Sequence, residues 1–191
     1  MKLHRAIPVL LLSVAAATAQ TSSVDAALLA KANGGDAAAQ VAVGEKLAAE
    51  SGSTQSARQI SEAYRQAAEW YKKAADQGNV AGMIHLAELL RSGKGVARDM
   101  AQAVDLYKKA ADKNDVNAQG ALGVLYSFGQ GVQQNYAEAY FWFDLAASAP
   151  GPDQARFAQN RQMAGAHITA DELEAVQDRV AAWKAKHPLA K

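Results

Sequence analysis

His85 and Glu88 are spaced so that they could hold a metal ion together. In a helix these two side chains lie one turn apart on the same face, and imidazole nitrogen and carboxylate oxygen are both zinc ligands. The other histidines beyond the N-terminal segment, His167 and His187, lie far away in the sequence. We therefore interpret the pair as a polar pair on a helix surface, and predict no metal site and no cofactor.

Gly93-Lys94-Gly95 is similar to a fragment of a phosphate-binding loop. Such a loop needs Ser or Thr after the lysine and a strand before it, and neither is expected here. The sequence also lacks G-x-S-x-G, S-x-x-K and H-E-x-x-H, the signatures of common serine hydrolases and zinc proteases. These patterns predict that the protein is not an enzyme.

The N-terminal residues are typical of a secretory signal peptide. A basic start, Met1 to Arg5, precedes an apolar run from Ala6 to Ala17, and Ala17-Thr18-Ala19 fits a small-x-small cleavage site. We predict that residues 1–19 are removed after Ala19 and that the protein is periplasmic or secreted. The apolar run is too short to span a bilayer, so we expect no membrane insertion after cleavage; an uncleaved anchor is the alternative.

Charge and cysteine content exclude several classes of function. Removal of residues 1–19 leaves 18 basic and 19 acidic side chains, a net charge of −1. This balance provides no electrostatic basis for binding nucleic acid or an anionic membrane. The absence of cysteine excludes disulfides, thiolate nucleophiles and cysteine-ligated zinc.

Three segments 36 residues apart carry the same residues at the same spacing. They are Ala67-x-x-Trp70-Tyr71-x-x-Ala74-Ala75, Ala103-x-x-Leu106-Tyr107-x-x-Ala110-Ala111 and Ala139-x-x-Trp142-Phe143-x-x-Ala146-Ala147. A period of this length predicts a solenoid, because each unit is too small to bury its own apolar face and must stack on its neighbours.

Each repeat reads as two helices joined by a glycine-rich turn. In the second repeat the helices begin at Asn79 and Asp99, and in the third at Asp115 and Asn135. The first repeat holds about seven extra residues within Ala49 to Glu62, which predict a long polar loop or an extended helix end. Small residues share equivalent positions, where we expect paired helices to approach closely: Gly44, Ala87 and Gly123 on first helices, and Ala67, Ala103 and Ala139 on second helices.

The third unit resembles a Sel1-like repeat, a relative of the tetratricopeptide repeat. Its matching residues are Asp115-x-x-Ala118-Gln119-x-x-Leu122-Gly123-x-x-Tyr126-x-x-Gly129-x-Gly131-Val132-x-x-Asn135-x-x-x-Ala139-x-x-Trp142-x-x-x-Ala146-Ala147. The resemblance implies an α/α superhelix that acts as an adaptor or scaffold for other proteins, often in bacterial envelopes. A cysteine-rich secreted branch of similar repeats is linked to β-lactam binding and hydrolysis, and this chain without cysteine departs from that branch.

The remaining residues predict closure of the solenoid. After Pro150-Gly151-Pro152, Asp153 is expected to cap a helix through about Gly165, and Thr169-x-x-Glu172 a last helix to about Lys186. We interpret this tail as a divergent fourth helix pair. The predicted fold is all-α, a superhelical solenoid of antiparallel helix pairs, with a lead-in segment at 20–31, repeats at 32–77, 78–113 and 114–148, and capping helices at 149–191.

First helices are expected to line the concave side of the superhelix. The positions free of packing there are Val41, Ala42, Glu45, Ile84, His85, Glu88, Gly120, Ala121 and Val124, which predict a groove with an apolar floor and carboxylate edges. Such a groove suits a peptide or helix with some basic character. Phe141 stands where the other repeats have Glu69 and Asp105, so it either packs under the terminal helices or anchors a partner.

These features together predict a non-catalytic adaptor or scaffold of the bacterial cell envelope that binds a protein or peptide in this groove. Two alternatives stay open. One is an envelope enzyme or a binder of small ligands or cell wall, related to β-lactams or peptidoglycan. The other is a permanent structural subunit of an envelope assembly.

Overall fold

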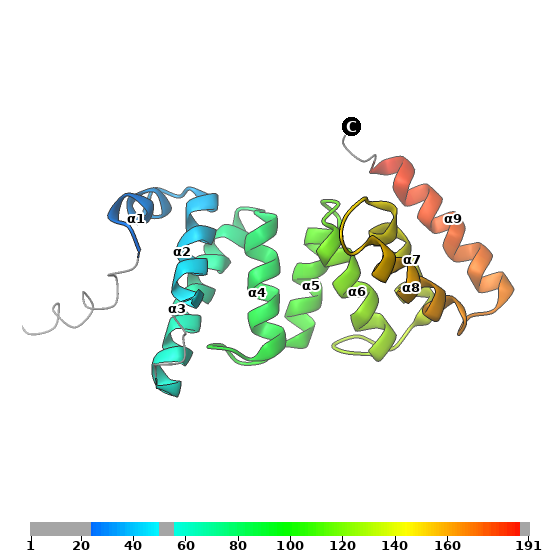
Figure 1. Cartoon of the computed structure of the whole chain (residues 1–191), viewed down its shortest axis with the longest axis horizontal. Coiled ribbons are helices and arrows are strands. Elements are labelled where there is room, and N and C mark those ends of the chain that lie inside the picture. The colour runs from blue at the N-terminus through cyan, green and yellow to red at the C-terminus, as the bar shows by residue number, and fades with distance from the viewer. Residues whose placement is uncertain (1–23, 50–55, 188–191) are drawn as a thin grey trace, which may run out of the picture.

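The computed structural model describes residues 24–49 and 56–187, which form nine α-helices and no strand. The helices are α1 (Ala26–Asn33), α2 (Ala37–Ala49), α3 (Ala57–Asp76), α4 (Val80–Ser92), α5 (Met100–Ala111), α6 (Val116–Phe128), α7 (Tyr136–Ser148), α8 (Gln154–Gly165) and α9 (Ala170–Lys186). From α1 to α8, each helix packs on the next along the chain, and Figure 1 shows α2 to α7 in a row. The all-α solenoid is confirmed, while the predicted signal peptide, residues 1–19, lies outside the described residues.

Polar caps fix where the helices begin. The Oδ1 atoms of Asp36, Asn79 and Asp115 each accept a backbone N–H at 2.8–2.9 Å, at the start of α2, α4 and α6. Asp99 and Asn135 do the same for α5 and α7, at 2.9 Å. Each cap satisfies a backbone donor that has no partner within the helix, so the sequence sets these boundaries locally.

The glycine turn between the two helices of a repeat packs against the second helix of the preceding repeat. Gly131 has a φ of 74°, and a Cβ there would lie 2.7 Å from the carbonyl oxygen of Met100 in α5. Gly95 has a φ of 69°, and a Cβ there would lie even closer to the backbone of α3 at Tyr64 and Arg65. Only glycine combines this backbone conformation with this close approach. The turns therefore join neighbouring repeats as well as the two helices of one repeat.

Aromatic rings explain the small residues of the first helices. The Tyr71 ring of α3 lies against Gly44 of α2, and the Phe143 ring of α7 lies against Gly123 of α6. A Cβ at Gly44 or Gly123 would come within 2.5–2.6 Å of ring carbons. On the second helices, Ala67, Ala103 and Ala139 are completely buried. The expected close approach is confirmed, and on the first helices it makes room for a ring.

The extra residues of the first repeat lengthen its second helix. Helix α3 has 20 residues, whereas α5 has 12. Ser56 begins α3 with a capping box, in which its hydroxyl accepts from the backbone of Gln59 and the Gln59 side chain accepts from the backbone of Ser56. Of the two expectations for this insert, the extended helix end is the one found from Ser56 onward, and residues 50–55 lie outside the described residues.

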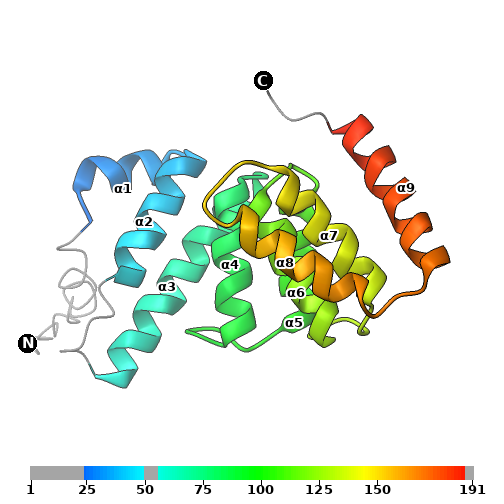
Figure 2. The same ribbon diagram turned by 45° about the vertical axis from the view of Figure 1, so that its right-hand side comes forward.

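The last two helices both pack on α7, from different sides (Figure 2). The boundaries of α8 and α9 and the Thr169–Glu172 capping box are as expected. The Asp153 side chain, expected to cap α8, instead accepts a hydrogen bond from Arg156 Nε at 3.0 Å. Helices α8 and α9 close the solenoid as expected, each covering α7 and packing on it more than on one another.

Candidate functional site

Helices α2 and α4 present a row of polar side chains, formed by Glu45, His85 and Glu88 together with the half-buried Ile84. We call this surface the first-helix face. His85 Nε2 lies 3.1 Å from Glu45 Oε1, and its ring stacks on Tyr71 of α3 with 4.8 Å between the ring centroids. The face therefore joins two repeats through contacts between residues 40 positions apart.

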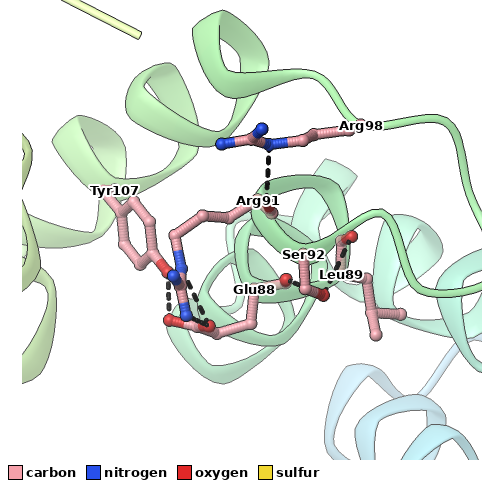
Figure 3. A network of polar contacts seen from close by, with 6 residues as sticks. All are labelled: Glu88, Leu89, Arg91, Ser92, Arg98 and Tyr107. Carbon is pink, nitrogen blue, oxygen red and sulfur yellow. Dashed lines mark hydrogen bonds and ion pairs between the residues drawn. The ribbon is translucent and has the colours of Figure 1, made fainter. Parts of the chain in front are cut away.

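The Glu88 carboxylate accepts hydrogen bonds from two side chains, Tyr107 of α5 and Arg91 of α4 (Figure 3). The Tyr107 hydroxyl of α5 donates to Glu88 Oε1, and Arg91 donates to Oε2 from Nη2 at 2.7 Å and from Nε at 3.1 Å. Arg91 is held in turn at its backbone, where its carbonyl accepts from Arg98 Nε at 3.1 Å. The carboxylate of Glu88 is thus fixed in position on a surface that stays open to solvent.

The two tyrosines of this face keep their protons. Burial, followed by the charge of Glu45, raises the pKa of Tyr71 to about 12. Burial and the hydrogen bond to Glu88 raise the pKa of Tyr107 as well. Neither hydroxyl is an available base or nucleophile near neutral pH, because a phenol has to ionise for those roles. Hydrogen bonding and ring stacking are what this surface offers to a ligand.

Metal binding is not supported at His85 and Glu88. His85 faces Glu45, whereas Glu88 faces Tyr107 and Arg91. Among residues 24–49 and 56–187, no three His, Cys, Asp or Glu side chains gather where they could hold a metal ion.

The third repeat differs from the other two on this face. Val124 and Phe143 take the positions of Glu88 and Tyr107, and both pack in an apolar cluster with Phe157 of α8. The Phe157 ring lies directly over Gly120, where a Cβ would overlap it. The expected groove therefore does not extend to Gly120 and Val124, since α8 covers α6 there.

Two further residues expected in the site lie elsewhere. Val41 is only 7% exposed and belongs to the core. Phe141 is 5% exposed and lies on α7, where the Arg179 guanidinium of α9 stacks at 4.8 Å from its ring centroid. Of the two interpretations of Phe141, packing under the terminal helices is the one that agrees with the structure.

Sequence reasoning missed Tyr71, Tyr107 and Arg91 as parts of this face. A signal was present, because the tyrosines stand 36 residues apart and Phe143 follows after another 36. In the same order, the first helices carry Glu45, Glu88 and Val124. The acid and the phenol are thus kept together in two repeats and lost together in the third.

Comparison with known protein families finds three Sel1 repeats in the chain, at residues 37–79, 80–115 and 116–150. Together they take in more than half of its length. The chain belongs to the Sel1 repeat family. Sel1 repeat proteins are typically scaffolds for protein interaction and are generally not catalytic. The exposed, hydrogen-bonded first-helix face is in keeping with that role.

Two solved structures are similar to this Sel1 repeat protein. One is a protective antigen of uropathogenic Escherichia coli that displays an SLR fold, with 26% identity and a TM-score of 0.62. The match covers 84% of this chain and 40% of the antigen, so the chain spans about two-fifths of that protein's length. The other is a Sel1 repeat protein from Oxalobacter formigenes, with 28% identity, a TM-score of 0.57, and coverage of 68% of this chain and 94% of that one.

None of the curated proteins compared with the sequence matches it. Within the part of the chain that the structure describes, no helix is both long enough and apolar enough to cross a bilayer.

Proposed function

We propose that this Sel1 repeat protein is an adaptor of the bacterial cell envelope that binds a partner protein or peptide on its first-helix face. The observation that carries the proposal is the paired change from Glu88 and Tyr107 to Val124 and Phe143. In the third repeat, where α8 covers the first helix, the pair is apolar, and in the open second repeat Glu88 and Tyr107 are polar and hydrogen-bonded. The open repeats thus keep an ordered carboxylate that core packing does not require.

The side chains of the first-helix face indicate what kind of partner it would bind. Glu45 and Glu88 supply carboxylate acceptors, and the partly exposed His85 ring, stacked on the buried Tyr71, lies beside Glu45. A peptide with basic side chains or free backbone N–H groups suits this combination. Holding Glu88 between Tyr107 and Arg91 lowers the conformational entropy lost on binding, because the side chain is already ordered.

The envelope location rests on the predicted signal peptide and on the likeness to an antigen of a bacterial pathogen. Export would place the adaptor where cytoplasmic partners are absent. Its expected partners are therefore other exported proteins.

Site-specific cross-linking in the native envelope tests the proposal. A photo-cross-linking amino acid is placed at Ala81, which is exposed on α4 one turn before His85. We expect a discrete protein adduct that is lost when Glu45→Gln and Glu88→Gln are combined. The matched control, Glu69→Gln with Asp105→Asn, removes two carboxylates from α3 and α5 and should leave the adduct unchanged. Absence of a protein adduct, or an adduct indifferent to Glu45 and Glu88, would overturn the proposal.

A further inference from the structure

A cavity of about 240 Å³ lies between the start of α6 and the ends of α7 and α9. Val116, Leu145 and Trp183 contribute to its apolar lining, and Gln119 of α6 contributes to its polar lining. We call it the α6–α9 cavity. It shares no residue with the first-helix face, so it is a separate site that the proposed adaptor function does not use.

Gln119 is the unusual residue of this cavity. It is only 3% exposed, yet its side-chain amide has no hydrogen-bond partner among residues 24–49 and 56–187. Most buried amides are hydrogen-bonded, because a buried donor or acceptor without a partner destabilises the fold. The Gln119 amide therefore has an N–H donor and an oxygen acceptor free for a molecule in the cavity.

The first repeat shows the same glutamine with its hydrogen bonds made. Gln40 follows the cap of α2 by four residues, as Gln119 follows the cap of α6. Gln40 is also buried, and its Oε1 accepts from Gln77 Nε2 at 2.8 Å. Its Nε2 donates to the Ala32 carbonyl at 3.1 Å. In this repeat the buried glutamine is thus satisfied by a second carboxamide and a carbonyl.

The third repeat lacks that second carboxamide. The position equivalent to Gln77, which follows α3, is Ala149, which follows α7. Ala149 and Gln119 both line the α6–α9 cavity. A glutamine at position 149 would cross the cavity to reach Gln119, as Gln77 reaches Gln40. The cavity therefore occupies the space that a carboxamide fills in the first repeat.

The second repeat shows that core packing does not require a glutamine at this position. Met83 of α4 is the residue equivalent to Gln119, and it is buried. An apolar side chain of similar length is therefore accepted on a first helix. The third repeat instead keeps the amide while its partner is absent.

We propose that the α6–α9 cavity binds the primary carboxamide of a ligand, with the amide against Gln119 and a short aliphatic stem against Leu145 and Trp183. A ligand N–H donates to Gln119 Oε1, as Gln77 donates to Gln40 in the first repeat. The ligand carbonyl accepts from Gln119 Nε2. A glutamine side chain, of a peptide or of the free amino acid, has this chemistry.

The charge at the cavity favours a neutral ligand over an anion. Lys184 also lines the cavity, but its Nζ pairs with Asp144 at 2.7 Å. This pairing reduces the attraction of Lys184 for a carboxylate in the cavity. A glutamate side chain, which has the shape of glutamine but no N–H to donate, should therefore bind less well.

Three blocked amino acids test the inference. The probes are N-acetyl-glutamine N-methylamide and its glutamate and methionine counterparts, which have a similar length but no carboxamide in the side chain. Binding to the mature protein is followed by the NMR signals of the Gln119 amide and the Trp183 indole. We expect the glutamine probe to bind about tenfold more tightly than the other two, as one additional hydrogen bond would provide. Free glutamine, titrated in parallel, distinguishes the free amino acid from a peptide side chain as the source of the carboxamide.

Two variants of the protein locate the binding. Gln119→Met introduces the residue that the second repeat has at Met83, so the fold should persist while the preference for the glutamine probe disappears. Ala149→Gln supplies the carboxamide from the chain itself. It should block the glutamine probe and raise the midpoint of thermal unfolding, and the rise should vanish when Gln119→Met is added. The matched control, Gln102→Met at an exposed position of α5, should leave the preference unchanged.

Four outcomes would overturn the inference. One is that the glutamine probe does not bind. Equal binding of the methionine probe would show an apolar cavity without selection of the amide, and equal binding of the glutamate probe would show selection of an anion. A preference for glutamine that survives Gln119→Met would place the carboxamide elsewhere on the protein.

Discussion

The first two repeats and the third share one backbone plan but treat their two surfaces in opposite ways. In the second repeat, Tyr107 and Glu88 form a polar pair on one surface and Asp105 is an exposed acid on the other. In the third, the equivalent residues Phe143, Val124 and Phe141 are apolar, and α8 and α9 cover them. The comparison indicates how this solenoid is capped: the third repeat keeps the backbone of the others, but its outward polar side chains are replaced by apolar ones on which the terminal helices pack. A repeat at the end needs such a cover because no further repeat packs on it.

The cover formed by α8 should have the largest effect on stability. Phe157 is 2% exposed and lies over Gly120. Phe157→Ala should lower the free energy of unfolding by about 3–5 kcal/mol, because it removes a buried ring and leaves a cavity. Urea denaturation followed by circular dichroism measures the change.

Gly120→Ala separates contact with Phe157 from a general effect of the substitution. In the native chain we expect it to destabilise by about 1–3 kcal/mol, because the new Cβ has no room beneath the ring. In the Phe157→Ala chain the room exists, and the gain in helix propensity should make Gly120→Ala stabilising by up to about 1 kcal/mol. Equal costs in both chains would show that α8 does not lie on Gly120.

Because α9 packs over the third repeat, a substitution at position 141 should affect stability very differently from one at the equivalent position 105 of the second repeat. Phe141→Asp gives the third repeat the acid found at Asp105, but beneath α9, where the carboxylate has lost its water. We expect destabilisation by about 3 kcal/mol or more and faster proteolysis of α9. The reverse change, Asp105→Phe, lies at an exposed position of α5 and should alter stability by no more than about 0.5 kcal/mol. Similar costs for the two changes would contradict the difference between the repeats.

Asp144 should matter more than an exposed acid of the first repeat. It is 9% exposed and accepts from Arg161 of α8 at 2.6 Å and from Lys184 of α9 at 2.7 Å, so it ties both covers to α7. Asp144→Asn should cost about 1.5–3 kcal/mol in thermal or urea unfolding. Its control is Asp76→Asn, which breaks the exposed pair with Lys72 and should cost no more than about 1 kcal/mol. A cost at Asp76 equal to that at Asp144 would show that burial does not separate the two pairs.

The sequence predicts the helices of this protein well because their boundaries are local. Asn79, Asp115 and Thr169 bond to backbone groups three residues away, and Gly129 ends α6 in the left-handed conformation. These signals can be read without knowing the rest of the fold. The 36-residue period adds the order of packing, since a repeat can only bury its apolar side against its neighbour.

The packing of α8 and α9 over the third repeat could not be predicted from local sequence signals. Nothing local at Gly120 shows that Phe157, 37 residues later, fills the space above it. An isolated glycine on a first helix is equally consistent with an open groove above it and with a close contact to another helix. The distinction emerges only when the three repeats are compared position by position, because Val124 and Phe143 lose their polar groups together.

Alkaline pH should also separate the first repeat from the third. Tyr71 has a pKa of about 12 in the folded chain against 10.0 for an unperturbed tyrosine, whereas Phe143 at the equivalent position cannot ionise. Because the unfolded state loses this proton first, the folded state binds more protons between pH 10 and 12, and the free energy of unfolding falls across that window. Below pH 10 the Tyr71 contribution should be constant. Urea denaturation at pH 9 to 11.5 should show a shallower decline for Tyr71→Phe than for the native chain. Equal slopes for Tyr71→Phe and the native chain would mean that the Tyr71 hydroxyl is not protected by burial beside Glu45.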